Sequence, residues 1–300
     1  MKKALLIILS LLLICGGAFI GVRYLLDLNA AKDIYTETEE KFILPVQTPM
    51  QSETQPEAQP EAQPEEDADV DDGHDFGNMF EVVKSWAGSG NSPEKSNDYI
   101  ISGPWQDMIN VDLKSLTIRY PDVKGWIFFE NEKISYPVVQ GYSDEKYIRM
   151  SYNGEKISAG SIFMEAFNAD DFSDAHTIIY GHNMKNRSMF GNLRNYLEQP
   201  KYYDGHQYFQ IIKLNSDGNI EKNRYRVFAY CKTQAQSEIY TVCREHDVKF
   251  AEVVNKIIEY SANKTGIPVS AENYVVTLST CSNGDNMLTV SGVLVDVDTQ

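Results

Sequence analysis

The fold is decided by a stretch near the C-terminus that reads Tyr274-Val275-Val276-Thr277-Leu278-Ser279-Thr280-Cys281. Its apolar, β-branched start predicts a strand, and the polar turn Ser282-Asn283-Gly284-Asp285 ends it. A similar apolar run at residues 177–180 is followed directly by Gly181-His182-Asn183-Met184. We therefore expect one cysteine and one histidine, each at the end of a strand.

Six further runs have the same strand character, and Gly, Asn, Asp and Pro residues separate them. They lie at residues 125–129, 134–139, 161–164, 208–212, 225–230 and 288–297. Eight short strands with such turns predict a mainly β fold, either a barrel or a sandwich. Two helices are expected beside them. One covers residues 111–120 and ends at Pro121, and the other lies between residues 245 and 262 with five aliphatic residues on one face.

The N-terminus has the pattern of a membrane anchor, which we assign to residues 1–26. Lys2 and Lys3 precede an uncharged, mostly apolar run at residues 4–22, and Arg23 follows it. Nineteen helical residues would extend about 28 Å, close to the thickness of a bilayer core. A cleaved signal peptide, or a lipoprotein modified at Cys15, is the alternative. The two lysines favour a cytoplasmic N-terminus, which would place the rest of the chain outside the cell.

Residues 27–98 are predicted to form an extended acidic tether. Gln-Pro-Glu-Ala occurs at residues 55–58 and again at 59–62, and a near-copy follows. Residues 51–75 hold ten acidic side chains and no Lys or Arg. Such a segment has almost nothing to bury, so we expect it to stay extended. A short amphipathic segment follows at residues 76–86, and the remaining domain is assigned to residues 99–300.

The charge balance excludes some classes of partner. The chain carries 27 Lys and Arg against 43 Asp and Glu, for a net charge of −16. A nucleic-acid partner would require a basic surface, so we expect none. Four cysteines are too few for a disulfide scaffold, and their spacing does not indicate a zinc site. Cys231 and Cys243 could form a disulfide, although Cys231 fits a core thiol better. We predict no required cofactor and no metal.

Cys281 and His182 are the candidates for catalysis. If the two strand ends meet, a thiolate could attack a carbonyl while an imidazolium protonates the leaving amine. The alternative is that neither residue is catalytic, because a cysteine after a strand is often a small buried hydrophobe and a histidine is often a surface group. The residues taken alone leave both interpretations open.

Several segments together resemble the sortases, which are membrane-anchored cysteine transpeptidases of Gram-positive bacteria, and class B in particular. The signature segment is Thr277-Leu278-Ser279-Thr280-Cys281. Residues 179–184 and 188–193 resemble the histidine segment of class B, and residues 122–127, 136–141 and 159–163 resemble its early strands. The helix near residues 247–262 lies where class B places an extra helix. The resemblance covers roughly residues 110–300.

The resemblance implies an eight-stranded β-barrel with N-terminal helices and a defined reaction. Cys281 would attack the Thr carbonyl of a C-terminal sorting signal, and His182 would act as general acid and then as base. Ser279 and Thr280 are the implied substrate contacts. The expected partners are surface proteins or pilins that carry the signal. The acceptor would be an amine of a peptidoglycan precursor or of a pilin.

One position departs from the family pattern. The family carries an Arg at the start of the strand after the cysteine, and alignment places Met287 there. A thioether cannot supply the hydrogen bonds of a guanidinium. Arg187, Arg224 and Arg226 are conceivable substitutes. The departure also keeps a second function open, in which a sortase-like domain binds sorting signals or partner proteins with little or no catalysis.

Overall fold

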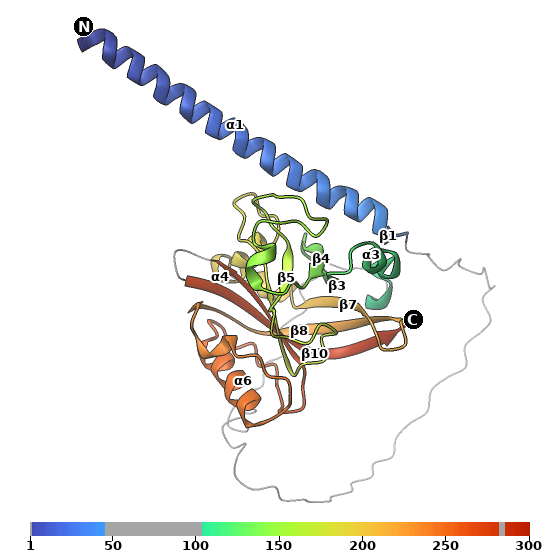
Figure 1. Ribbon diagram of the computed structural model, residues 1–300. Helices are drawn as coiled ribbons and strands as arrows, with labels where there is room; N and C mark the ends of the chain where they lie inside the picture. The colour runs from blue at the N-terminus through green and yellow to red at the C-terminus, as the bar shows by residue number, and fades with distance from the viewer. Residues whose placement is uncertain (1, 46–103, 282–285) are drawn as a thin grey trace, which may run out of the picture. The chain divides into compact units, whose positions relative to one another are not determined.

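The structure is a computed structural model that describes residues 2–45, 104–281 and 286–300. The side chains of residues 2–17 and of Cys281 also lie outside the described part. The amphipathic segment predicted at residues 76–86 and most of the predicted tether fall outside the described residues as well. Figure 1 shows the course of the chain.

Eight strands close into a barrel in the order β10-β8-β7-β3-β4-β5-β6-β9. Two neighbouring pairs, β4 with β5 and β6 with β9, are parallel, and the other pairs are antiparallel. The barrel confirms the mainly β prediction and decides between barrel and sandwich. The strands are β3 (Val123–Phe129), β4 (Ser135–Val139), β5 (Ile162–Met164), β6 (His176–Tyr180), β7 (Tyr208–Leu214), β8 (Ile220–Gln234), β9 (Val275–Cys281) and β10 (Asn286–Thr299).

The helices are short apart from the first and the last. α1 (Lys2–Phe42) opens the chain and runs into β1 (Ile43–Leu44), which pairs with β2 (Asn110–Val111). The short helices are η1 (Trp105–Asp107), α3 (Leu113–Arg119), η2 (Asp144–Tyr147), η3 (Gly191–Arg194), α4 (Asn195–Glu198), α5 (Tyr202–Gly205) and η4 (Glu238–Tyr240). α6 (Val248–Tyr260) lies between β8 and β9.

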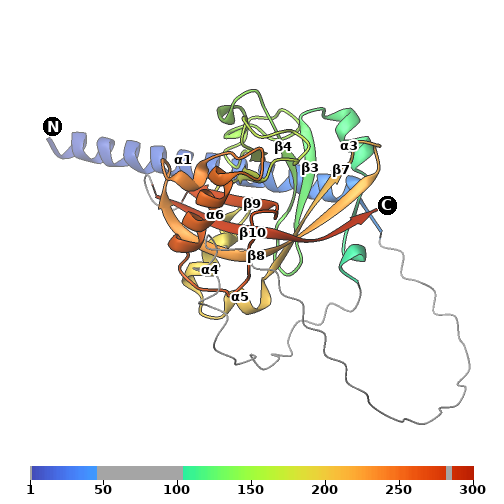
Figure 2. The same ribbon diagram turned by 90° about the horizontal axis from the view of Figure 1, so that it is seen from below.

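The predicted helices are confirmed with shifted starts, and their caps explain the shifts. Asp112 accepts a hydrogen bond from the Ser115 N–H and begins α3, while the residues before it belong to β2. Asp247 caps α6 in the same way through the Phe250 N–H at 2.9 Å. The buried residues of α6 include Phe250, Val253 and Ile257, and the helix packs against β8. Figure 2 shows α6 beside the barrel strands.

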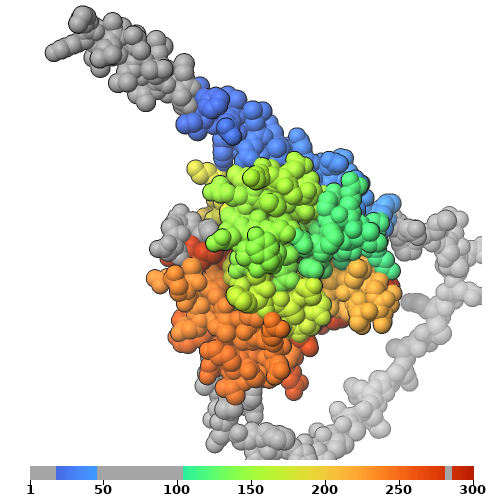
Figure 3. Space-filling view, viewed as in Figure 1, coloured from blue at the N-terminus to red at the C-terminus, as the bar shows by residue number. Residues whose placement is uncertain are grey.

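The prediction of an extended tether from residue 27 is wrong for residues 27–42, which belong to α1. Ile34 and Tyr35 of this stretch are buried, and the Tyr35 hydroxyl donates to the Gly160 carbonyl at 2.6 Å. Thr38 donates to the Tyr152 hydroxyl, and Asp27 accepts from Ser158. Figure 3 shows this part of α1 against the surface of the barrel domain. The composition of residues 27–42 did not indicate this helix, because only a narrow face of it is buried.

The predicted membrane-spanning helix at residues 4–22 is not supported by the structure. Across the described part of the chain, no helix combines the length and the apolar character needed to cross a bilayer. Phe19, Ile20 and Val22 of α1 are 66%, 69% and 56% exposed.

Cys231 and Cys243 are both free and buried. Cys231 lies in β8, and its Sγ is 3.1 Å from the Thr289 hydroxyl of the neighbouring strand β10. Burial raises the pKa of both thiols, that of Cys243 to about 11. The open alternative of a disulfide is therefore resolved in favour of core thiols.

Candidate active site

The parallel pair β6 and β9 brings the two predicted catalytic positions to one edge of the barrel. Tyr180 is paired with Ser279, and the Gly181 N–H extends the ladder by donating to the Ser279 carbonyl at 3.1 Å. His182 and Cys281 are each two residues beyond that pair in the same direction. Neighbouring strands are about 4.8 Å apart, so the backbone places these positions side by side. The contact between their side chains stays a prediction, since the Cys281 side chain lies outside the described part.

A pocket of about 330 Å³ opens at this edge. Three of the predicted site residues line it, namely His182, Ser279 and Thr280. Met287 lines it too, and the antiparallel register of β9 and β10 sets Met287 directly opposite Cys281. Met287, which the resemblance puts at the position of the family Arg, therefore lies opposite the cysteine in the register.

His182 is oriented by a backbone carbonyl. Its Nε2 lies 2.7 Å from the carbonyl oxygen of Ile148. A carbonyl only accepts, so Nε2 carries a proton and the neutral ring has its lone pair on Nδ1. Gly160 makes this arrangement possible, because a Cβ at its positive φ of 56° would overlap the carbonyl oxygen of Ile148.

Sequence reasoning missed a wall of aromatic side chains in this pocket. Tyr180 ends β6 and Tyr240 ends η4, and their rings are nearly parallel with centroids 6.3 Å apart. The hydroxyls of Tyr240 and Ser279 are 2.9 Å apart. Tyr240 belongs to the insertion between β8 and β9, residues 235–274. No sequence spacing links it to the strand ends, because tertiary contacts alone bring this insertion against the barrel.

A buried histidine holds this insertion in place. His176 is fully buried, and its Nδ1 donates to the carbonyl of Thr241 at 2.8 Å. Its Nε2 therefore accepts from the Thr277 hydroxyl at 2.8 Å, and Thr277 in turn accepts from Ser291 at 2.9 Å. Burial lowers the pKa of His176 to about 4. The neutral ring thus ties three strands to the residue that follows Tyr240.

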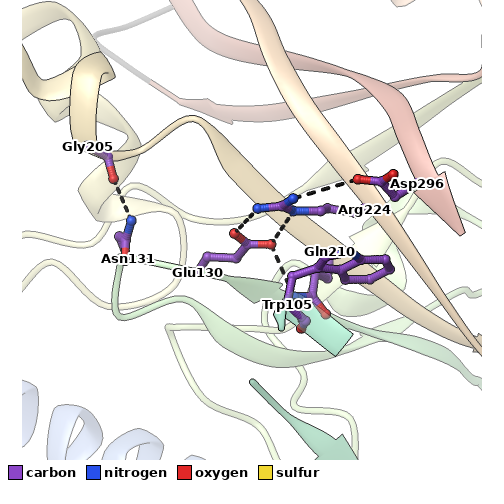
Figure 4. A network of polar contacts seen from close by, with 7 residues as sticks. All are labelled: Trp105, Glu130, Asn131, Gly205, Gln210, Arg224 and Asp296. Carbon is purple, nitrogen blue, oxygen red and sulfur yellow. Dashed lines mark hydrogen bonds and ion pairs between the residues drawn. The ribbon is translucent and has the colours of Figure 1, made fainter. Parts of the chain in front are cut away.

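None of the three substitute arginines reaches the pocket. Arg224 forms a two-point ion pair with Glu130 at 2.7 and 2.8 Å and lies 3.6 Å from Asp296, as Figure 4 shows. It is nine residues before Thr233, which is paired with Met287, so it lies about 30 Å away along β8. The same register excludes Arg226, which donates to Gln207.

Arg187 is also engaged elsewhere. It donates to Asn195 at 2.6 Å and lies 3.4 Å from Glu198. Among the described residues that line the pocket there is no Lys or Arg. The group that would stabilise an oxyanion is therefore not supplied by any of the candidates from the sequence.

Thr280 is the remaining polar group beside the cysteine. Its side chain is buried, and its hydroxyl has no hydrogen-bond partner within the described residues. A hydroxyl in this state gains free energy when a ligand supplies a partner. Thr280 is therefore suited to contact a bound substrate, and the contact that the resemblance implies stays a prediction.

Comparison with known proteins identifies relatives of this arrangement. No family model matches the chain. Sortase B of Listeria monocytogenes is 31% identical over 172 residues, which cover 57% of this chain and 67% of that protein. Sortase B of Staphylococcus aureus is 28% identical over 178 residues, or 59% and 70%.

Solved structures give the same result. A crystal structure of sortase B from Bacillus anthracis in complex with AAEK1 has a TM-score of 0.55 at 31% identity. The match covers 61% of this chain and 84% of that one. A Staphylococcus aureus sortase B–substrate complex has a TM-score of 0.55 at 26% identity, covering 61% and 84%.

Proposed function

The chain belongs to the class B sortases and is a sortase-type cysteine transpeptidase, and on that premise we propose that it cleaves a C-terminal sorting signal after a Thr residue through a thioester on Cys281. The observation that supports the proposal is the parallel register of β6 and β9, which brings the backbone positions of His182 and Cys281 to the same edge of the barrel, where His182, Ser279 and Thr280 line a pocket. A substrate complex of a relative supports the same class of ligand.

The reaction has two half-steps that balance. The Cys281 thiolate attacks the Thr carbonyl carbon, a C–S bond forms and the C–N bond to the next residue breaks. The leaving amine takes its proton from the His182 imidazolium. An acceptor amine then attacks the thioester, its proton passes to Nδ1 of the now neutral His182, and the thiolate is released. The product is an amide link to the acceptor, an amine of the cell wall or of a pilin.

Full-length protein tests this proposal with a sorting-signal peptide and an amine acceptor. Cys281→Ala should abolish cleavage, and His182→Ala should reduce it nearly as far because the leaving amine loses its proton donor. Cys231→Ala and Cys243→Ala serve as controls, since both thiols are buried away from the pocket. Turnover that persists in Cys281→Ala would refute the thioester mechanism.

Met287 favours one alternative, a sortase-like protein that binds sorting signals with little catalysis. An enzyme that lacks one hydrogen-bond donor to the oxyanion typically loses about 10²–10³ in kcat. Measured binding of a signal peptide without any cleavage or acyl-enzyme, under conditions in which a relative turns over, would favour that alternative. Formation of a thioester adduct by mass spectrometry would exclude it.

We further propose that the protein sits in the cell membrane with the barrel outside. The uncharged run at residues 4–22 supports this location, as does the exposure of Phe19 and Ile20 on α1. Membranes of the native host should retain the full-length protein through high-salt and carbonate washes. Release by salt alone would show that the run does not anchor the chain.

A further inference from the structure

A second pocket, the helix–loop pocket, lies between α1 and the loop that follows η2 and has a volume of about 480 Å³. Arg23 of α1 lines it together with Arg149 and Lys156 of the loop. Asp27 is the one acidic residue among the described residues that line it. The pocket at the strand ends has the opposite character, because Asp144 lines it and no described Lys or Arg does. The helix–loop pocket therefore carries a net positive charge.

The acid of the helix–loop pocket is already engaged, whereas its cations are not. Both carboxylate oxygens of Asp27 accept the Ser158 N–H at 3.3 Å, and the Ser158 hydroxyl donates to one of them. Within the described residues, the side chains of Arg23, Arg149 and Lys156 make no hydrogen bond and no ion pair. All three are exposed. Their N–H donors are therefore free to receive an anionic ligand.

The apolar side chains of this pocket indicate what the anion is attached to. Phe19, Ile20 and Tyr24 line the pocket from α1, and all three are exposed. They lie at the end of the uncharged run of residues 4–22, which we propose to be the membrane anchor, and Arg23 is the first charged residue after it. Tyr and Arg side chains at the end of a membrane segment lie at the depth of the lipid headgroups. The ligand that combines charge and apolar surface at this depth is a lipid.

We propose that Arg23, Arg149 and Lys156 bind the phosphate group of an anionic membrane lipid. A guanidinium offers two parallel N–H donors to a phosphate, and the lysine ammonium adds a further charge. The acyl chains of the lipid lie along Phe19 and Ile20. This inference rests on the proposed membrane location, because only there does the pocket meet lipid headgroups.

The bound lipid would link α1 to the barrel domain at the membrane surface. Arg23 belongs to α1, whereas Arg149 and Lys156 belong to the loop between η2 and β5, so one phosphate bridges both parts. The side of the barrel that carries this loop is thereby held toward the bilayer. The site would thus orient the enzyme, in addition to the anchoring that residues 4–22 provide.

Two lipids with the same phosphate make a matched pair of probes. Phosphatidylcholine adds a quaternary ammonium, which would lie among three cations of the same sign and be repelled. Phosphatidylglycerol has no such ammonium and keeps a net negative charge. Inorganic phosphate has the negative charge but no acyl chains, so it separates a lipid site from a site for soluble phosphate.

Native mass spectrometry of the detergent-solubilised, full-length protein tests the proposal. The protein is titrated with phosphatidylglycerol and phosphatidylcholine of identical acyl chains, and bound lipid is counted as added mass. Phosphatidylglycerol should bind more tightly, and a higher ammonium acetate concentration should narrow the difference. Equal affinities for the two lipids would overturn the proposal.

Arg149→Gln combined with Lys156→Gln removes two of the three cations without changing α1. This double variant should bind phosphatidylglycerol about 30-fold more weakly, the ratio that about 1 kcal/mol for each cation gives. Lys114→Gln combined with Arg119→Gln is the matched control. It also removes one Lys and one Arg, both exposed, from α3, which lies near the other end of α1 (Figure 1) and outside the pocket. Unchanged affinity in the first pair, or an equal loss in the control pair, would overturn the proposal.

Two further results separate this inference from the proposals on which it rests. A large excess of inorganic phosphate should leave phosphatidylglycerol bound, because phosphate cannot make the apolar contacts, and complete displacement would overturn the assignment to a lipid. The binding assay requires neither turnover nor a bilayer. A protein that is inactive, or that salt releases from membranes, would therefore still support the site if it prefers phosphatidylglycerol and loses this preference in the first double variant.

Discussion

Lowering the pH from about 7.5 to about 5 should cost the protein about 2 kcal/mol of unfolding free energy through His176 alone. This ring is fully buried, donates to Thr241 and accepts from Thr277, and burial lowers its pKa from 6.5 to about 4. The folded state therefore stays neutral between these values while the unfolded state takes up a proton. The stabilising contribution is complete above pH 6.5 and is lost as the pH falls toward 4, by about 3 kcal/mol at the limit.

Chemical denaturation of the wild type and of His176→Gln at several pH values measures this contribution. Other groups also titrate in this range, so the decisive quantity is the difference in pH dependence between the two proteins. The wild type should lose about 2 kcal/mol more than the variant between about pH 7.5 and about pH 5. His246→Gln, which removes an exposed histidine, is the control. Parallel pH profiles for the wild type and His176→Gln would refute the assignment of a buried neutral ring.

Three further changes test other parts of the structure. Met287→Arg should raise kcat/KM for signal cleavage about tenfold or more, because it places a hydrogen-bond donor for the oxyanion opposite the cysteine. An unchanged or lower kcat/KM would show that another group already stabilises the oxyanion. Gly160→Ala should lower kcat, because the added methyl group would displace the Ile148 carbonyl that orients His182. Gly154→Ala is the control, because Gly154 also has a positive φ but has open space around it, and its kcat should stay near the wild-type value. Equal kcat values in the two variants would contradict the role of Gly160. Lys222→Met should lower the unfolding free energy by about 3 kcal/mol in urea titrations, because the buried ammonium donates to three acceptors that would lose their partner; a change below about 1 kcal/mol would count against it.

The strands were predictable from sequence because their residues are buried on regular patterns. All eight runs became strands of one barrel, and β3 illustrates why, since five of its seven residues are buried. Local composition could not predict how far the strands extend. β8 continues to Gln234 and β10 begins at Asn286, because pairing with a partner strand stabilises even polar segments.

The candidate site was predictable only where a motif carried it. The positions of His182 and Cys281 follow from two short segments, and the parallel register explains why these segments converge. Asp144 and Tyr240 were not predicted, because each reaches the pocket from a connection whose path depends on tertiary packing. The three arginines were weighed as substitutes without knowledge of the register, which places two of them far along β8.

The pairing of β1 with β2 changes what the acidic segment between them can do. Ile43 lies opposite Val111, and the Asp112 N–H donates to the Phe42 carbonyl at 2.8 Å, so the chain returns to the place it left. The described residues on either side of this segment therefore meet at one strand pair, and the contacts of α1 with the barrel domain fix its distance from the barrel. A protease cut within the segment would leave two pieces held together by buried contacts, such as those of Tyr35. Native gel filtration should show one species where a denaturing gel shows two, and new chain ends could be opened at this point without separating α1 from the barrel.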